Sequence, residues 1–225
     1  GHTSALAALL TSGEVSADSI LAIFGKTEGN GCVNDFTRGY ATQSLKLELS
    51  EHLPPAEIDR IAMVMSGGTE GGLSPHWLVF SVTDAPPSDT PALAIASVAT
   101  RPLSPSEIGR QAQVDLVRDA VQAGMQKAGI ASEADVHFVQ IKCPLLTSER
   151  CDQVNGDVAT TDTLKSMGLS RGASALGVAQ ALGEIETVHP EQICADRSLW
   201  SSHASTSAGV ELMRCEIVVL GMSTT

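Results

Sequence analysis

Short apolar runs of strand length alternate along this chain with Ala/Leu-rich segments that have partly helical spacing. The apolar runs predict buried strands, because each is too short to form a typical helix. The Ala/Leu-rich segments between them predict helices. The predicted strands are residues 19–24, 61–65, 78–82, 92–98 and 136–141, and the predicted helices are residues 4–10, 35–49 and 105–128. Strands and helices in alternation predict an α/β fold.

Turn residues mark the ends of several of these elements. Gly13 and Gly129 follow predicted helices at the position where helices commonly end on glycine. Residues 104–107 (Ser-Pro-Ser-Glu) predict a helix start, because they put proline at the first helical position and an acid in the first turn. Ser66 follows a predicted buried strand and precedes Gly67-Gly68. We expect a sharp turn there that lets the backbone approach a ligand closely.

The two halves of the chain share a pattern. The interval from Gly13 to Lys26 equals the interval from Gly129 to Lys142, and each lysine follows a predicted strand. This match in spacing and context predicts an internal duplication.

Each lysine is followed by an arginine in an Ala/Leu-rich segment, Arg38 or Arg171, where we expect a helix to open. Each arginine is followed by a serine and small residues, in Ser66-Gly67-Gly68 and in Ser207-Ala208-Gly209. The order Lys, Arg, Ser therefore occurs twice, although the intervals between these residues differ.

A Pro/Ser/Asp segment at residues 84–91 is the best candidate for a boundary between the two copies. We expect a first repeat unit at residues 1–86, without its opening strand, and a second at residues 87–214. Residues 215–225 resemble the strand that opens the second unit, so they predict the truncated start of a third.

Composition and charge narrow the function. The chain of 225 residues has a net charge of −12, which argues against a nucleic-acid partner, since phosphate contacts need clustered Lys and Arg. No apolar run is long enough to span a membrane, and no signal peptide opens the chain. The five cysteines are scattered and include no C-x-x-C pair, which favours a reduced, cytoplasmic protein.

The repeated residue types can perform nucleophilic chemistry. A serine hydroxyl needs a base within hydrogen-bond reach, and a lysine serves when burial disfavours its charged form. The planar guanidinium of arginine suits the carbonyl oxygens of a planar ligand. Backbone N–H groups after each serine can stabilise an oxyanion. Together these groups predict a Ser-Lys amidohydrolase that needs no metal, whereas each residue taken alone is more typical of an ordinary surface or capping residue.

Other motifs are incomplete. Gly25-Lys26-Thr27 matches the end of a P-loop, but Ile20 stands where its first glycine is required. The six histidines lack metal-ligand spacing, so we expect no metal site in this segment. Cys32 and Cys143 lie near the two lysines, and we expect both to be inert, buried thiols.

Four motifs carry a family resemblance. They are Gly25-Lys-Thr-Glu-Gly-Asn-Gly-Cys-Val-Asn-Asp35, Met65-Ser-Gly-Gly-Thr-Glu-Gly71, Lys142-Cys-Pro-Leu-Leu146 and Ser170-Arg-Gly-Ala-Ser-Ala-Leu176. Over nearly its whole length the chain resembles the cyanuric acid hydrolase/barbiturase family. The resemblance implies three α/β units around a pseudo-threefold axis, of which two are present. Each unit of that family supplies one Ser, one Lys and one Arg to a central site that opens cyclic ureides or imides.

The resemblance also implies roles for these residues. It makes Ser207 the nucleophile and Lys142 its activating base, with Ser205 as the alternative nucleophile. The residues implied to bind the substrate are Lys26, Arg38, Ser66, Gly67, Arg171 and Ala208. The substrate implied is cyanuric acid, an s-triazine, with barbituric acid as the rival within the same enzyme class.

The absent third unit has consequences under this resemblance. It would supply a third of the site and, in some members, a structural metal, so we expect no cofactor in this segment and little activity from residues 1–225 alone. The resemblance implies a homotetramer for the complete protein. A rival from another class is a non-catalytic ligand-binding or assembly fragment.

Overall fold

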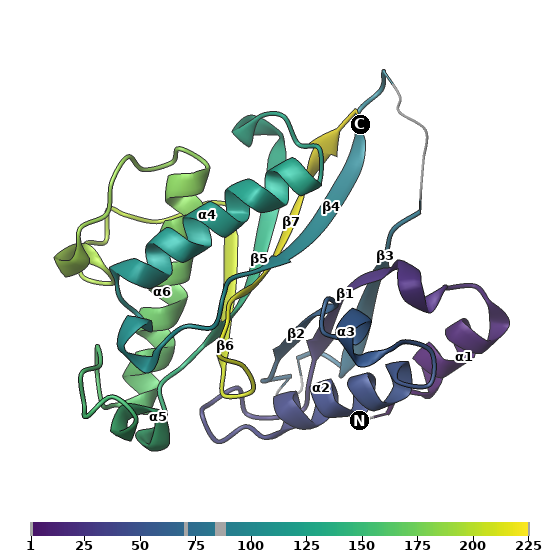
Figure 1. Cartoon of the computed structure of the whole chain (residues 1–225), viewed down its shortest axis with the longest axis horizontal. Coiled ribbons are helices and arrows are strands. Elements are labelled where there is room, and N and C mark those ends of the chain that lie inside the picture. Colours follow the sequence, from purple (N-terminus) through teal and green to yellow (C-terminus); the bar gives the residue numbers. More distant parts are fainter. Residues whose placement is uncertain (1, 70–71, 84–88, 225) are drawn as a thin grey trace. The chain divides into compact units, whose positions relative to one another are not determined.

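The computed structural model describes residues 2–69, 72–83 and 89–224 (Figure 1). The chain divides into two compact units, Gly1–Ala85 and Pro86–Thr225. This division falls within the segment 84–91 that the sequence predicts as a boundary, although residues 84–88 lie outside the described residues. The assignment of residues 1–86 and 87–214 as evolutionary repeats stays a prediction.

The first unit is built on a mixed sheet with the strand order β2-β1-β3. β1 is parallel to β2 and antiparallel to β3. The elements of this unit are α1 (Ser4–Ser12), a 3₁₀ turn (Ala17–Ser19), β1 (Ile20–Lys26), α2 (Thr37–Leu49), α3 (Pro55–Ile58), β2 (Ala62–Ser66) and β3 (His76–Ser81).

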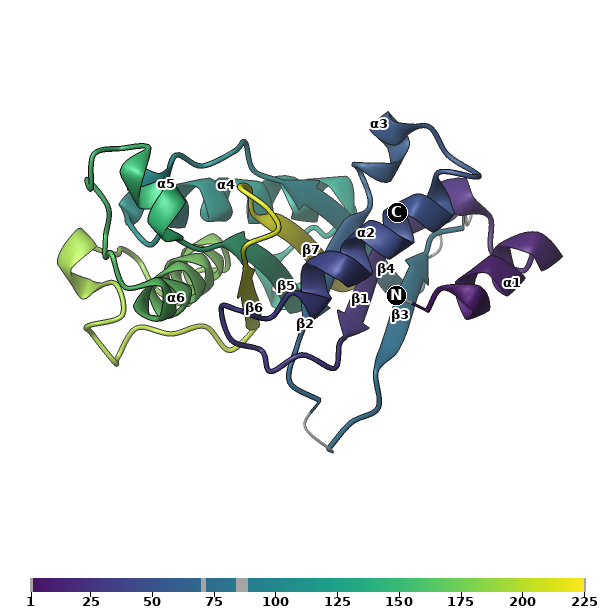
Figure 2. The same cartoon turned by 90° about the horizontal axis from the view of Figure 1, so that it is seen from below.

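One apolar cluster holds this unit together. The buried apolar side chains of α2 are Ala41, Leu45 and Leu49, spaced four apart, so they share one face of the helix. That face packs with Met63 of β2 and Ile23 of β1 in the same cluster. Figure 2 shows α2 lying across these strands. Full burial of each large apolar side chain stabilises the fold by about 1.5–3 kcal/mol, so this cluster fixes α2 on the sheet.

The second unit is built on a mixed sheet with the order β4-β7-β5-β6. β5 is parallel to β6, while β7 is antiparallel to both β4 and β5. Its strands and α-helices are β4 (Ala92–Ala99), α4 (Gln111–Lys127), β5 (Val136–Pro144), α5 (Ser148–Asp152), α6 (Thr163–Ala181), β6 (Ala204–Gly209) and β7 (Glu216–Ser223). Short 3₁₀ turns lie at Pro105–Glu107, Glu133–Asp135 and Pro190–Gln192.

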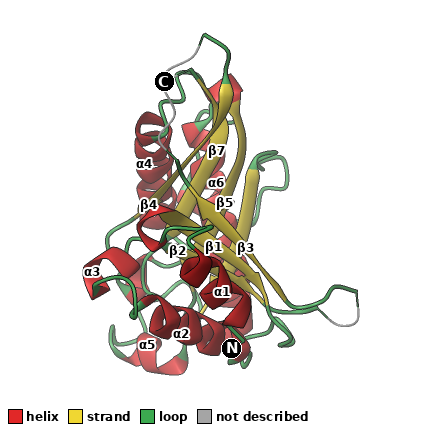
Figure 3. Cartoon of the chain, turned by 90° about the vertical axis from the view of Figure 1, so that its right-hand side faces the viewer, coloured by secondary structure: helices red, strands yellow, loops and turns green. Residues whose placement is uncertain are grey.

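Helices α4 and α6 pack against each other, α4 against β4 and β7, and α6 against β5 and β6 (Figure 3). Small residues allow this close packing. A Cβ atom on Gly177 of α6 would lie only 2.6 Å from the carbonyl oxygen of Val114 and 2.8 Å from Cβ of Val117, both on α4. In a chain with few aromatic residues, small residues such as Gly, Ala and Ser thus let the two helices approach closely.

Two predicted helix starts are wrong. Pro105–Glu107 forms a separate 3₁₀ turn, and α4 begins only at Gln111, because Ile108 and Arg110 are both extended. Arg171 does not open a helix but lies within α6, which begins at Thr163. The true start is set by Asp162, whose side chain accepts a hydrogen bond from the backbone N–H of Lys165 at 3.0 Å.

The assignment of residues 215–225 as the truncated start of a third unit stays a prediction. Glu216–Ser223 forms β7, which pairs with β4 on one side and with β5 on the other. β7 is thus an inner strand of the second unit, and it takes the place beside β5 that β3 has beside β1. An inner strand of one sheet and the opening strand of a further unit are both apolar runs, so composition alone does not distinguish these two roles.

Candidate active site

Each sheet pairs one lysine with one serine on adjacent parallel strands. In the first unit Lys26 of β1 is in register with Ser66 of β2. In the second unit Lys142 of β5 is in register with Ser207 of β6. Residues in register lie on the same face of a sheet, since side chains alternate between faces along a strand. The repeated order seen in the sequence thus becomes a repeated Lys–Ser contact.

The second pair is the more buried. The side chain of Lys142 is 0% exposed, and its Nζ lies 3.3 Å from Oγ of Ser207. The alternative nucleophile, Ser205, is in register with Gln140 rather than with the lysine. The geometry therefore joins Lys142 to Ser207 and not to Ser205.

A carboxylate that was not predicted from the sequence completes this cluster. Oε1 of Glu211 lies 2.9 Å from Nζ of Lys142, and the glutamate side chain is only 10% exposed. A signal was present in the sequence, because Ser66-Gly-Gly-Thr-Glu70 and Ser207-Ala-Gly-Val-Glu211 share the same Ser-to-Glu spacing. Glu70 lies outside the described residues.

Arg150 fixes the loop that carries Glu211. Its Nη1 donates to the carbonyl oxygen of Leu145 at 2.5 Å, and its Nη2 donates to the carbonyl oxygens of Val210 and Leu212 at 2.7 and 3.2 Å. Burial lowers the pKa of Arg150, and the negative charge of Glu211 opposes that shift. The guanidinium thus ties the end of β5 to the residues on both sides of Glu211.

The first-unit pair has different surroundings. Nζ of Lys26 lies 3.5 Å from Oγ of Ser66 and donates to the carbonyl oxygen of Gly67 at 2.8 Å. Lys26 is half-buried, whereas Lys142 is fully buried. Within the described ranges, Lys26 forms no ion pair of the kind that joins Lys142 to Glu211. The two pairs therefore differ in how deeply the lysine is buried.

Asp35 orders the loop between β1 and α2, and the sequence analysis gave it no role in the site. Burial opposes its ionisation, but hydrogen bonds from the Thr37 hydroxyl, from the N–H groups of Gly31 and Thr37, and the charge of Arg38 hold its pKa below the ordinary value of 3.8. The carboxylate also lies directly against Gly67, where a Cβ atom would overlap Oδ2 of Asp35. Asp35 therefore holds the turn after Ser66 and the start of α2 together.

The two predicted arginines are placed differently within their units. Arg38 is buried, and its Nη2 donates to the carbonyl oxygen of Cys32 at 2.7 Å. Arg171 is exposed on α6, close enough for its charge to act on the thiols of Cys143 and Cys194. The guanidinium of Arg171 therefore lies near Cys143, the residue that follows Lys142 in the sequence.

The cysteine prediction holds for one thiol and fails for the other. Cys143 is buried, and burial raises the pKa of its thiol, although the charges of Lys142 and Arg171 oppose the shift. A stable thiolate beside Lys142 is therefore disfavoured. Cys32 is exposed, contrary to the prediction, because it lies in the loop before α2.

Comparisons with known proteins show the family of the chain. A family model described as amidohydrolase ring-opening protein matches residues 1–225. The chain belongs to this ring-opening amidohydrolase family. It is 58% identical to a cyanuric acid amidohydrolase of Ectopseudomonas oleovorans and 55% identical to one of Azorhizobium caulinodans, matches that cover 97% and 98% of this chain and 63% of each relative.

Solved ring-opening amidohydrolases have the same fold. A crystal structure of the cyanuric acid hydrolase from A. caulinodans matches with a TM-score of 0.93 and 54% identity, over 98% of this chain and 63% of that one. A second cyanuric acid hydrolase structure matches with a TM-score of 0.91 and 47% identity, over 99% of this chain and 64% of that one. The chain thus spans less than two thirds of these relatives, which is consistent with two of three repeat units.

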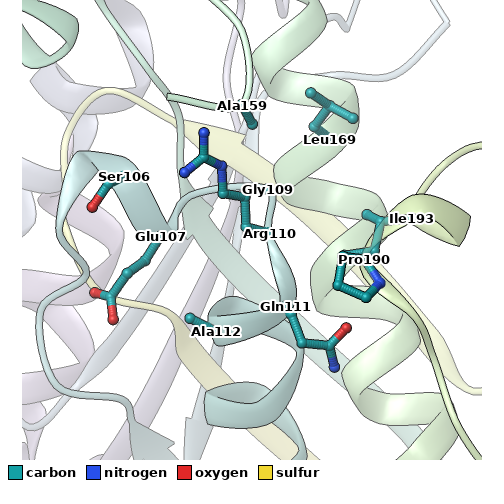
Figure 4. Close-up of a pocket in the computed structure, with 10 residues that line it drawn as sticks. All are labelled: Ser106, Glu107, Gly109, Arg110, Gln111, Ala112, Ala159, Leu169, Pro190 and Ile193. Carbon is teal, nitrogen blue, oxygen red and sulfur yellow. The ribbon is translucent and has the colours of Figure 1, made fainter. Parts of the chain in front are cut away.

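The second unit of this family member also contains a cavity of about 530 Å³ that holds none of the predicted site residues (Figure 4). Its lining residues are Ser106, Glu107, Gly109, Arg110, Gln111, Ala112, Ala159, Leu169, Pro190 and Ile193. The charge of Arg110 is paired with Asp157 at 3.0 Å, so it does not mark a ligand site.

No helix within residues 2–69, 72–83 and 89–224 is both long and apolar enough to cross a membrane. The same residues include no group of three or more His, Cys, Asp or Glu side chains arranged to hold a metal ion.

Proposed function

We propose that the complete protein hydrolyses cyanuric acid by opening its ring, with Ser207 as the nucleophile and Lys142 as the base. The observation that carries the proposal is the contact of 3.3 Å between the fully buried Nζ of Lys142 and Oγ of Ser207. The names of its relatives, cyanuric acid amidohydrolases, support the choice of substrate.

The reaction proceeds in two stages. Oγ of Ser207 attacks a ring carbonyl carbon while its proton goes to Lys142, and the carbonyl oxygen becomes an oxyanion. The ring C–N bond then breaks, the leaving nitrogen takes a proton from Lys142, and the opened product stays bound to Ser207 as an acyl group. Water then attacks the acyl carbon while its proton goes to the same lysine, the bond between that carbon and Oγ of Ser207 breaks, and Oγ takes the proton back from the lysine. This reaction needs no metal.

The remaining residues bind the substrate. The backbone N–H of Ala208 stabilises the oxyanion at Ser207, a contribution that is typically worth about 2.7–4 kcal/mol. Arg171 binds a ring carbonyl oxygen through its planar guanidinium. In the first unit, Lys26, Arg38, Ser66 and the N–H of Gly67 bind and polarise the substrate. The half-buried Lys26, which donates to a backbone carbonyl, suits binding better than proton transfer.

Hydrolysis assays of the complete protein with cyanuric acid and with barbituric acid test this proposal. We expect cyanuric acid to be opened, and we expect Ser207→Ala to lower kcat by at least about 10³-fold. Ser205→Ala is the matched control, and it should retain activity because Ser205 is in register with Gln140. Turnover of barbituric acid alone would assign the protein to barbiturase chemistry instead.

A non-catalytic role is tested on the same protein. Ligand binding without turnover of either ring, together with unchanged affinity in Lys142→Ala, would show a binding or assembly protein. We further propose a cytoplasmic homotetramer, and sedimentation equilibrium of the complete protein checks the assembly.

A further inference from the structure

We propose that Glu211 is a positioning residue that holds Lys142 against Ser207 and accepts a proton from it during the reaction. This inference rests on the proposed function of Ser207 and Lys142. It starts from one arrangement, in which Nζ of Lys142 lies between Oε1 of Glu211 at 2.9 Å and Oγ of Ser207 at 3.3 Å.

The environment of Glu211 restricts it to this position. Oε1 and Cδ lie over Gly209, where a Cβ atom would come within 2.6 and 2.5 Å of them, so the carboxylate occupies space that only glycine leaves open. Arg150 holds the carbonyl groups of both neighbours, Val210 and Leu212. The carboxylate is therefore aimed at Lys142 from a loop that is fixed on both sides.

Proton transfer explains why a buried lysine has a carboxylate beside it. A neighbouring opposite charge favours the ammonium form, which cannot accept the proton of Ser207 unless it gives one up. Lys142 therefore passes one ammonium proton to Oε1 of Glu211 as it receives the proton of Ser207. Lys142 stays an ammonium, Glu211 becomes a carboxylic acid, and the negative charge passes to the substrate carbonyl oxygen. The same proton returns through Lys142 to the leaving ring nitrogen.

The other charged or titratable groups that the described residues place near Lys142 or Glu211 do not match this role. Arg150 from α5 and Arg171 from α6 are cations, and Cys143 has a thiol whose pKa burial raises. Glu216 is in register with Lys142 on β7, but its Oε1 is paired with Nη2 of Arg214 at 3.1 Å. Glu211 is thus the acid best placed to exchange a proton with Lys142.

The test compares Glu211→Gln with wild type in the complete protein. Glutamine keeps the shape but cannot accept the proton, so we expect kcat to fall about 10²- to 10⁴-fold. The acid limb of the pH–kcat profile should move to higher pH, because the variant works only once Lys142 itself loses its proton. A proton inventory in mixed H₂O and D₂O should change from a two-proton curve in wild type to a one-proton line.

Two variants separate this role from a structural one. Glu211→Asp keeps the carboxylate and should recover part of kcat together with the wild-type pH limb. Glu107→Gln removes a half-buried carboxylate that pairs with Arg101, and it should leave the profile unchanged. A Glu211→Gln protein with kcat within twofold of wild type and an unshifted acid limb would overturn the inference. Failure of the wild type to open cyanuric acid would instead refute the proposed function.

Discussion

A single methyl group at residue 209 should separate Glu211 from Lys142 without unfolding the protein. In Gly209→Ala, Cβ would lie 2.5 Å from Cδ and 2.6 Å from Oε1 of Glu211, and in direct overlap with Oε2. Because ordinary contact begins at 3.4 Å, the carboxylate must move by about 1 Å. The displaced group is the end of a flexible side chain, so the backbone of β6 can stay in place.

That movement disrupts a buried ion pair. The distance of 2.9 Å between Nζ of Lys142 and Oε1 of Glu211 would lengthen as the carboxylate moves away from residue 209. Losing a contact with a charged group costs about 1.5–3 kcal/mol, which corresponds to a roughly 10- to 150-fold loss in rate if the contact is needed in the transition state. We therefore expect kcat/KM for cyanuric acid to fall by that factor, while the melting temperature changes by only a few degrees.

Gly168→Ala is the matched control, since Gly168 lies in α6 and a Cβ atom there would meet nothing within 4 Å. Replacing a helical glycine should stabilise the protein by about 0.5–1 kcal/mol and leave kcat/KM unchanged. The measurements are steady-state kinetics and thermal unfolding of both variants. Equal kcat/KM in Gly209→Ala and Gly168→Ala would refute the reasoning.

Three further predictions concern the supports of the site. Asp35→Asn should destabilise the protein by about 1–3 kcal/mol in chemical unfolding, because an amide nitrogen would face an N–H donor. The pKa of Asp35 is below 3.8, so the difference in unfolding free energy between wild type and Asp35→Asn should be constant above about pH 5. It should shrink as the pH falls through the folded-state pKa of Asp35, and a difference that does not depend on pH would contradict this prediction. Arg150→Met should lower the free energy of unfolding by about 2–4 kcal/mol, since three carbonyl groups lose their hydrogen-bond donor. An unchanged free energy of unfolding would show that Arg150 does not hold this loop. Ser66→Ala should raise KM more than it lowers kcat, and the opposite pattern in steady-state kinetics would give Ser66 the role of nucleophile.

Much of the fold follows from local patterns in the sequence. The predicted strand at residues 92–98 forms as Ala92–Ala99, and the predicted helix at residues 4–10 forms as Ser4–Ser12. Gly13 and Gly129 both have positive φ values, 73° and 66°, as expected for residues that follow helices. These elements were predictable because apolar periodicity and cap residues act within a few positions of each other.

Local patterns are insufficient where distant residues decide the structure. Residues 216–223 belong to the second sheet because of pairing with β4 and β5, which no local pattern encodes. Arg171 lies within a helix whose start is set by Asp162, a signal that the Ala/Leu-rich segment concealed. The pairing of Lys142 with Ser207 was expected from the repeat, whereas the contact of Glu211 depends on a loop held by Arg150.

The assignment of Ser207 as nucleophile is tested most directly by trapping the acyl intermediate. The complete protein is mixed with cyanuric acid, quenched in acid within the first turnover, digested, and analysed by peptide mass spectrometry. We predict that the mass of the ring-derived acyl group appears on the peptide that contains Ser207 and is absent in Ser207→Ala. The same mass on the peptide that contains Ser66, with Ser207 unmodified, would contradict the assignment.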